Sequence, residues 1–98
     1  MPMHNPPHPG TFIASVYLEP HGISGKALAS KLRVVPTTLH RILRGQGSVN
    51  SEMALRLAEC LGRSPESWLA MQAEYDLWFA RQTANAGTIK ALHANKRP

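Results

Sequence analysis

Apolar residues recur at three- and four-residue steps along most of this chain, the spacing that places side chains on one face of an α-helix. Between Pro9 and Gly22 the apolar positions that share such a face are Phe12, Ile13, Val16 and Tyr17. Four further stretches repeat the spacing, over residues 24–32, 36–45, 50–62 and 64–81. No stretch of useful length alternates with the period of two that a β-strand requires. The pattern therefore predicts an all-α domain of five helices.

Residues that favour helix ends stand at the borders of these stretches. Ser24, Asn50 and Ser64 have side-chain oxygens that can accept a hydrogen bond from the first turn of a helix. Pro36 and Pro65 suit the first helical position, where the missing N–H would have no partner in any case. The inward faces that the spacing then predicts are, helix by helix, Leu28, Ala29 and Leu32; Leu39, Ile42 and Leu43; and Ala54, Leu57, Ala58 and Leu61.

The second and third predicted helices are short, and only the segment 33–35 links them. Two short helices joined by so tight a turn cross steeply, as they do in a helix-turn-helix unit. Ala29 fits this arrangement because a small side chain lets the two helices approach closely. Leu32, Val34 and Leu39 would fill the angle between them. The outward face of the third helix would then carry Thr37, Thr38, His40, Arg41 and Arg44.

The net charge of +5 is unevenly distributed along the sequence. Residues 1–50 hold five basic residues against one acid, residues 51–80 two against five, and residues 81–98 four against none. No acid interrupts residues 26–44. Basic residues on short helices can form an ordinary solvated face, but such a face usually mixes both signs. The asymmetry therefore favours a polyanionic partner.

The side chains of the third predicted helix match the edges of DNA bases. An arginine such as Arg41 can donate two hydrogen bonds to O6 and N7 of guanine, and Thr37 and Thr38 can bond a base edge or touch a thymine methyl group. His40 lies beside them and is equally compatible with an ordinary surface histidine. We therefore expect this helix to read DNA through the major groove.

Phosphate contacts are expected at the end of this helix and around it. Arg44, Gln46 and Ser48 lie at that end or in the Gly45–Ser48 loop, and we expect the backbone N–H groups of the loop to bind phosphate oxygens as well. Further cations would add a non-specific attraction to DNA. These are Lys26, Lys31 and Arg33.

We divide the chain into a proline-rich, flexible arm (residues 1–8), a helix-turn-helix domain (residues 9–81) and a basic, mobile tail (residues 82–98). Four prolines among the first ten residues favour an extended arm. The last predicted helix holds more aromatic residues than one small core absorbs, and aromatic residues concentrate at interfaces. A two-fold dimer would also match a palindromic DNA site. We expect a homodimer whose interface includes Tyr75, Trp78 and Phe79.

The sequence carries no pattern typical of an enzyme, a metal site, a cofactor site or a small-molecule site. His4 and His8 fall in the expected arm, and the single cysteine, Cys60, has no second cysteine with which to form a zinc site. We expect Cys60 to be a buried, inert thiol. No apolar run approaches the ~20 residues that span a bilayer. The first residues lack the features of a secretion signal, so we expect a cytoplasmic protein.

Several longer stretches together carry a family pattern. The helix-turn-helix part is ISGKALASKL (23–32) followed by TTLHRILRG (37–45), and HPG stands at 8–10. More specific are MALRLAECLG (53–62) and SPESWLAMQAEYDLW (64–78). Together these stretches resemble the HigA-type antitoxins, a branch of the Xre (lambda-repressor-like) helix-turn-helix family. The sequence departs from that pattern where Arg33 replaces a turn glycine and Val35 replaces a serine or threonine cap.

The resemblance implies a lambda-repressor-like fold and two activities. Proteins of this kind neutralise a RelE-like ribonuclease toxin (HigB) encoded beside them, and they repress their own operon by binding operator DNA as dimers. Thr37, Thr38 and Arg41 would read bases, with His40 and Arg44 as flanking or phosphate contacts. The toxin surface stays open between the two chain ends and an acidic group, Glu59, Glu66, Glu74 and Asp76, which is equally compatible with ordinary solvent-facing helix charges. Two alternatives remain, a stand-alone Xre-family regulator and an interaction module that no longer binds DNA.

Overall fold

The computed structural model describes residues 5–83 and residue 92. The described chain is all-helical and contains no β-strand, which confirms the predicted fold class. Its elements are α1 (Pro9–Ile13), a π-helical turn η1 (Ala14–Leu18), a 3₁₀ turn η2 (Glu19–His21), α2 (Gly25–Leu32), α3 (Pro36–Leu43), α4 (Ser51–Leu61) and α5 (Pro65–Thr83). Because α1, η1 and η2 follow one another without a break, they form the first of the five predicted helices. Residues 1–4 of the predicted arm and most of the predicted tail lie outside the described residues.

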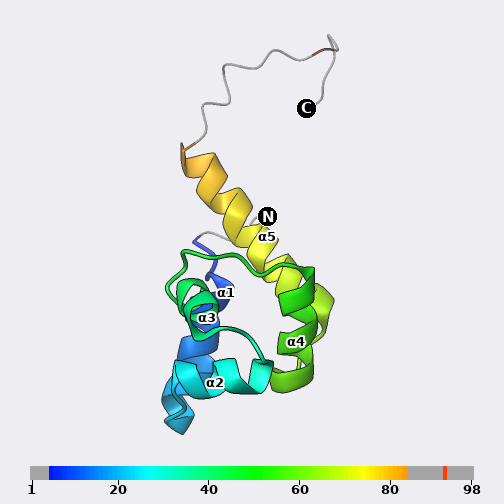
Figure 1. Ribbon diagram of the computed structural model, residues 1–98. Coiled ribbons are helices and arrows are strands. Elements are labelled where there is room, and N and C mark those ends of the chain that lie inside the picture. Colours follow the sequence, from blue (N-terminus) through cyan, green and yellow to red (C-terminus); the bar gives the residue numbers. More distant parts are fainter. Residues whose placement is uncertain (1–4, 84–91, 93–98) are drawn as a thin grey trace.

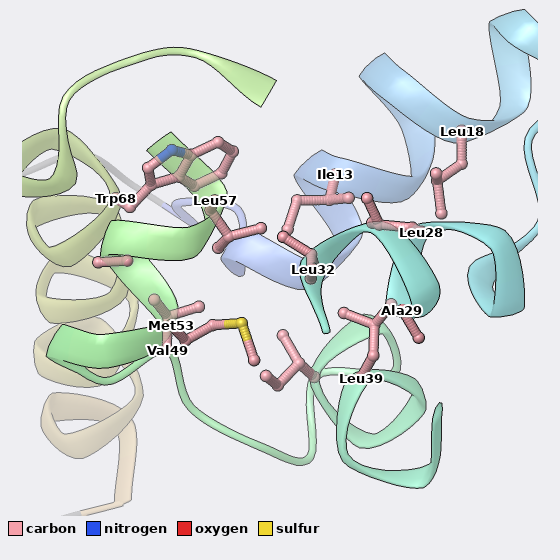
Figure 2. Packing of buried hydrophobic residues seen from close by; sticks show 12 residues of the cluster. Ile13, Leu18, Leu28, Ala29, Leu32, Leu39, Val49, Met53, Leu57 and Trp68 are labelled. Carbon is pink, nitrogen blue, oxygen red and sulfur yellow. The ribbon is translucent and has the colours of Figure 1, made fainter. Parts of the chain in front are cut away.

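The helices pack around one core, to which α5 contributes only through its N-terminal part (Figure 1). α5 lies along α4 and against α1, while its C-terminal half extends beyond the other helices. The buried apolar side chains come from every helix, as Figure 2 shows. Trp68 is fully buried among them, and its indole N–H donates a hydrogen bond to the carbonyl of Gly62 at 3.0 Å. The start of α5 is therefore fixed to the turn that precedes it.

The first helical segment differs from the prediction because it contains the π-helical turn η1. The N–H of Glu19 donates to the carbonyl of Ala14, five residues back, instead of four as in an α-helix. The wider turn rotates the following side chains around the helix axis. Val16, predicted to face inward, is 42% exposed, and Leu18 takes the inward place. The prediction for Val16 is therefore wrong.

The predicted caps are confirmed. The side chains of Ser24, Asn50 and Ser64 accept hydrogen bonds from the backbone N–H three residues later, at 2.9–3.0 Å. Val35 occupies the N-cap position of α3 without a side-chain hydrogen bond, and Pro36 opens that helix. α3 thus begins with the fixed φ angle of a proline and not with a hydroxyl cap.

Two further expectations are corrected by the structure. Cys60 is exposed on α4 rather than buried, because the buried face of α4 is formed by Met53, Ala54 and Leu57. His8 was assigned to a flexible arm, but its side chain is buried and caps α1, since Nδ1 accepts the N–H of Gly10 at 2.9 Å. His8 is therefore part of the folded domain and not of a flexible arm.

Candidate nucleic-acid interface

The helices α2 and α3 form the predicted helix-turn-helix unit. Ala29 is fully buried where the two helices meet, and its carbonyl accepts the N–H of Val34 at 3.1 Å. Arg33 adopts the left-handed conformation, with φ at 60°. A glycine would reach that conformation without steric cost, whereas an L-residue with a side chain is strained there. The turn therefore keeps its geometry despite the absence of glycine.

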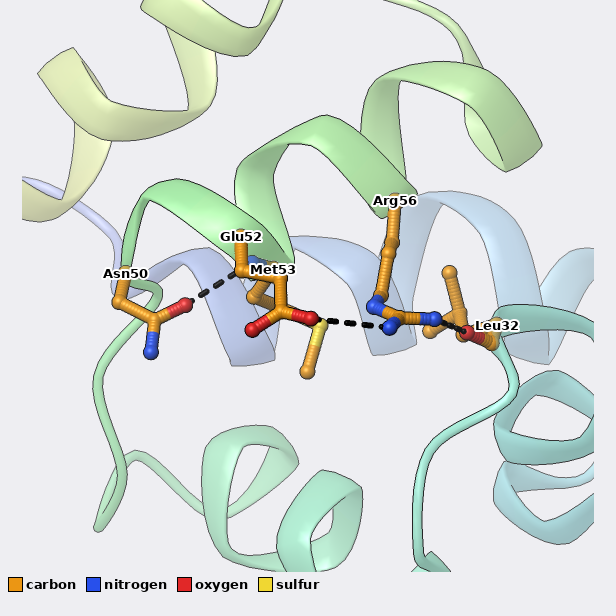
Figure 3. A network of polar contacts seen from close by, with 5 residues as sticks. All are labelled: Leu32, Asn50, Glu52, Met53 and Arg56. Carbon is orange, nitrogen blue, oxygen red and sulfur yellow. Dashed lines mark hydrogen bonds and ion pairs between the residues drawn. The ribbon is translucent and has the colours of Figure 1, made fainter.

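A charged network holds the outer end of α2 against α4, as Figure 3 shows. Arg56 on α4 donates to the carbonyl of Leu32 at 2.9 Å and pairs with Glu52 one helical turn earlier at 3.0 Å. Leu32 is the last residue of α2, so its carbonyl has no helical partner. Arg56 supplies the missing donor and so fixes the helix-turn-helix unit to α4. No pattern in the sequence singles out Arg56.

The predicted DNA-reading residues lie together on the outer face of α3. The inner face is anchored by Leu39 and Ile42, which are buried in the core. The outer face carries exposed Thr37, Thr38, His40, Arg41 and Arg44. Among the described residues the ion pair present is that of Arg56 with Glu52, so neither arginine of α3 has a carboxylate partner there. The arrangement presents hydrogen-bond donors and positive charge to solvent from a fixed helix.

The beginning of α2 borders this face. Lys26 is exposed in the first turn of α2. The neighbouring Gly25 lies so close to α3 that a Cβ atom there would stand 3.1 Å from Nε2 of His40. The imidazole of His40 therefore leans on the start of α2, at the edge of the exposed face. This position suits a flanking contact better than a central one.

The loop after α3 is built differently from the expectation. The N–H groups of Gly45, Gln46 and Gly47 all donate to carbonyls of Ile42 or Arg41, at 2.8–2.9 Å. Those groups cap the end of α3 and cannot also bind phosphate, so the expectation of a phosphate-binding backbone is wrong for these three positions. The side chains of Gln46 and Ser48 are exposed as predicted. Phosphate contacts of this loop are therefore left to its side chains and to the backbone N–H of Ser48.

Two buried polar residues that the sequence analysis missed hold this loop. Gln72 on α5 accepts the N–H of Val49 at 2.8 Å and donates to Asp76 at 3.0 Å. His8 lies at the other end of the loop, where a Cβ atom added at Gly45 would stand 3.8 Å from its ring. Histidine is not a common helix cap, and Gln72 reads as an ordinary polar position on a long helix. The one available signal was HPG, in which Pro9 marks a helix start and so points to a cap at position 8.

The charge state of His8 follows from its surroundings. Burial lowers the pKa of His8 below its ordinary value of 6.5, and a backbone hydrogen bond with Gly47 and the charge of Asp76 oppose this only in part. Nδ1 accepts a hydrogen bond from Gly10, which requires that nitrogen to carry no proton. The neutral imidazole therefore joins α1 to the loop.

The three aromatic residues of the predicted dimer interface differ in exposure. Tyr75 is half-buried, and its ring meets the edge of the His8 ring at a centroid distance of 4.9 Å. Phe79 stacks on Tyr75 with its centroid 6.2 Å away and is 52% exposed. Trp78 is half-buried beside them. The dimer contact remains a prediction, and Phe79 is its most accessible member.

Other kinds of site find no support in the described part of the chain. Over residues 5–83, no three side chains of histidine, cysteine, aspartate or glutamate are grouped closely enough to hold a metal ion. Of the described helices, none combines the length and apolar character that crossing a membrane requires. The exposed face of α3 and its bordering loop are therefore the candidate site.

Comparisons with known proteins agree with this geometry. The chain matches the helix-turn-helix family over residues 17–68. It is 43% identical over 75 residues to virulence-associated protein I of Dichelobacter nodosus, and this alignment covers 76% of this chain and 69% of that protein. It is 39% identical over 72 residues to antitoxin HigA-1 of Vibrio cholerae, and this alignment covers 74% of this chain and 68% of that protein.

Solved structures give the same result. The fold is similar to that of antitoxin GraA, with a TM-score of 0.84, 39% identity, and coverage of 92% of this chain and 99% of that chain. It is similarly close to antitoxin GraA in complex with its operator, with a TM-score of 0.81, 38% identity, and coverage of 96% and 97% of the two chains. Both similarities extend well beyond the helix-turn-helix unit.

Proposed function

Because the chain belongs to the HigA-type branch of the Xre-like helix-turn-helix family, we propose that it is an antitoxin that represses its own operon by binding operator DNA in the cytoplasm. The observation that carries the proposal is the outer face of α3, where Thr37, Thr38 and Arg41 are exposed on a helix anchored by a buried inner face. The similarity to an antitoxin that was solved with its operator supports it. The family is one of DNA-binding regulators rather than enzymes.

The proposed DNA contact divides into base reading and phosphate binding. Thr37, Thr38 and Arg41 are the proposed base readers, because their side chains can bond base edges in the major groove. The proposed phosphate and flanking contacts surround them on α2, α3 and the following loop. They are Lys26, His40, Arg44, Gln46 and Ser48. Each of these side chains is exposed.

A binding measurement tests the repressor role. The DNA upstream of the gene for this chain and a shuffled duplex of equal length are titrated with the protein across a salt series. We expect tighter binding to the upstream DNA, and an affinity that falls with salt at a slope of about 0.9 for each phosphate contact on a double-logarithmic plot. Equal affinity for both duplexes, or an affinity indifferent to salt, would reject the role.

We further propose that the chain binds and neutralises a RelE-like ribonuclease toxin, and that it acts as a homodimer. An exposed acidic group on α4 and α5 is suited to a basic partner, because opposite charges steer association. The group consists of Glu59, Glu66, Glu74 and Asp76. The homodimer is supported by Phe79, which lies in the C-terminal half of α5 and is exposed.

Co-expression tests the antitoxin role. The gene next to that of this chain is induced alone, with the parent chain, and with a variant in which the four acids are replaced by their amides. We expect the parent chain to restore growth and the amide variant to restore less. The matched control is Arg41→Ala, which alters the DNA face and should restore growth like the parent. An adjacent gene whose product is harmless, or whose toxicity the parent chain does not relieve, would reject this role.

A second candidate function has a specific basis in the turn of the helix-turn-helix unit. Arg33 is strained and Val35 offers no hydroxyl to a phosphate, so this chain could serve as an interaction module without DNA binding. The exposed readers on α3 favour the repressor instead. A stand-alone regulator without a toxin partner is the remaining alternative, and the co-expression experiment separates it from the antitoxin.

A further inference from the structure

His8 lies at a junction of three parts of the molecule that the chain separates widely. Its side chain is 4% exposed and caps α1 through the N–H of Gly10. The same ring meets Tyr75 of α5 edge-on and lies against Gly45, the second residue after α3. The ring also shares the lining of one open cavity, of about 450 Å³, with Arg44. One imidazole thus contacts α1, α5 and the loop after the recognition-type helix.

The loop that His8 touches carries a proposed phosphate contact at its beginning. Arg44 is the C-cap residue directly after α3, and its position depends on how the last turn of that helix is closed. That turn is closed by the loop itself, because Gly45 donates to Ile42 and both Gln46 and Gly47 donate to Arg41. A displacement of the loop would therefore move Arg44 and the end of α3 together.

Both ends of the loop are held by buried polar side chains, one from α5 itself and one packed against α5. Gln72 bonds the backbone of Val49 at the far end, and His8 packs against Gly45 at the near end while its ring rests on Tyr75. α1 packs tightly on α3 beside His8, since a Cβ atom at Gly10 would overlap the carbonyl of Ile42. Residues outside the loop therefore hold it in place, and of these His8 lies nearest to Arg44.

We propose that His8 is a positioning residue for DNA binding, which acts through the backbone of the Gly45–Ser48 loop to hold Arg44 where the phosphates of the duplex pass. This inference rests on the proposed repressor function and adds to it a residue that lies outside the helix-turn-helix unit. His8 itself is buried and touches no DNA. Its effect is exerted through the loop, so it should disappear when the phosphate contact of Arg44 is removed.

The test separates the cap of α1 from the contact with the loop. His8→Asn keeps a side chain that caps helices well but removes the ring that lies against Gly45 and Tyr75. We expect this variant to fold and to dimerise like the parent, as followed by circular dichroism and sedimentation. Its affinity for the upstream DNA should fall about tenfold, the scale of one lost charge-assisted contact. Its salt slope should fall by about 0.9, the share of one phosphate contact. The matched control is His21→Ala, at an exposed position in η2, outside the loop.

A double-mutant cycle with Arg44→Ala decides whether His8 acts through that arginine. Groups that act as a unit give non-additive losses, whereas independent groups give additive ones. We expect His8→Asn to cost no further affinity once Arg44 is alanine. Additive losses, or parental affinity and salt slope in folded His8→Asn, would overturn the proposal. If His8→Asn does not fold, His8→Gln is measured instead, and loss of fold in both variants would assign His8 to the core and also overturn it.

The outcomes keep this inference apart from the proposed function. If the parent protein binds upstream and shuffled DNA alike, the repressor role itself fails. If the parent binds the upstream DNA specifically and Arg44→Ala weakens it, but His8→Asn changes nothing, then only the role of His8 fails.

Discussion

Gln72 on α5 accepts a hydrogen bond from the backbone N–H of Val49, 23 residues earlier in the chain, with 2.8 Å between oxygen and nitrogen. The amide is buried, and its other end donates to Asp76. A buried N–H without a partner would cost about 1–3 kcal/mol, so this bond is required where the loop after α3 enters α4. The helix proposed to form the dimer is thereby joined to the loop beside the proposed DNA face.

The contact between α1 and α3 predicts a strong effect at Gly10. A Cβ atom there would stand 1.7 Å from the carbonyl oxygen of Ile42, which is backbone and cannot turn aside. We expect Gly10→Ala to lower the free energy of unfolding by about 3 kcal/mol or more, since overpacking of this kind forces backbone shifts. Denaturant unfolding followed by circular dichroism measures this.

The control for that prediction is the same substitution at Gly22. A Cβ atom there would meet no atom within 4 Å, although φ is 64°. Gly22→Ala should therefore cost only the conformational penalty of about 1 kcal/mol. Equal losses in the two variants would show that the close approach of α1 and α3 is not rigid.

The buried imidazole of His8 predicts a pH dependence of stability. Its pKa lies below the ordinary 6.5 because burial disfavours the charged form. As the pH falls below 6.5, the unfolded chain takes up a proton that the folded chain does not, so stability falls until the pH reaches the folded pKa. The charged groups near the ring are Asp76 and Arg44. We expect the unfolding free energy of the parent to decline below pH 6.5 relative to that of His8→Asn. A constant difference between the two proteins would contradict this.

The helix boundaries could be predicted from the sequence where they depend on side chains within one helical turn. Ser24, Asn50 and Ser64 cap their helices in the structure as the sequence indicates, because a cap depends on residues within one turn. The exposed face of α3 follows from the same helical spacing. Every residue predicted to read bases lies on it, although binding itself remains a proposal.

The predictions of side-chain burial are wrong where a distant contact or an irregular turn determines the burial. The π-helical turn η1 moves Val16 outward, and no pattern in its sequence marks the extra residue of the turn. His8 and Gln72 are polar residues that become buried only because α1, α5 and the loop meet around them. Cys60 stands next to Leu61 in an apolar helix sequence but falls on the outer side of α4. Such placements depend on tertiary packing, which a single sequence does not encode locally.

The proposed dimer interface predicts the effect of a charge at Phe79. The ring is 52% exposed on the extending part of α5, and an aspartate there would place a charge in an apolar contact. We expect Phe79→Asp to weaken the dimer at least about tenfold in sedimentation at several concentrations. Leu55→Asp is the control, because Leu55 is an apolar residue on α4 that is also more than half exposed. A parent that sediments as a monomer at all concentrations would refute the dimer.

The strained turn predicts a stabilising substitution at Arg33. Its φ of 60° costs an L-residue about 1–2 kcal/mol relative to glycine. Arg33→Gly relieves this strain and also loses the charge, so Arg33→Ala, which loses the charge alone, is the reference. We expect Arg33→Gly to unfold at a free energy about 1 kcal/mol higher than Arg33→Ala, part of the gain being offset by the larger freedom of glycine in the unfolded chain. Equal stability of the two variants would mean that the turn relaxes around the side chain.

Arg41 is expected to determine which bases are preferred. Its guanidinium is exposed on the outer face of α3, and no carboxylate among the described residues pairs with it. Removing a bidentate contact with guanine costs about 1–3 kcal/mol of discrimination, so Arg41→Ala should bind the upstream DNA more weakly while its affinity for shuffled DNA changes little. Lys26→Ala is the contrasting variant, because an exposed lysine that only attracts phosphates should weaken both duplexes alike and lower the salt slope by about 0.9. If Arg41→Ala lowers both affinities in parallel, as Lys26→Ala does, then Arg41 binds the backbone of the duplex and only Thr37 and Thr38 remain to read bases.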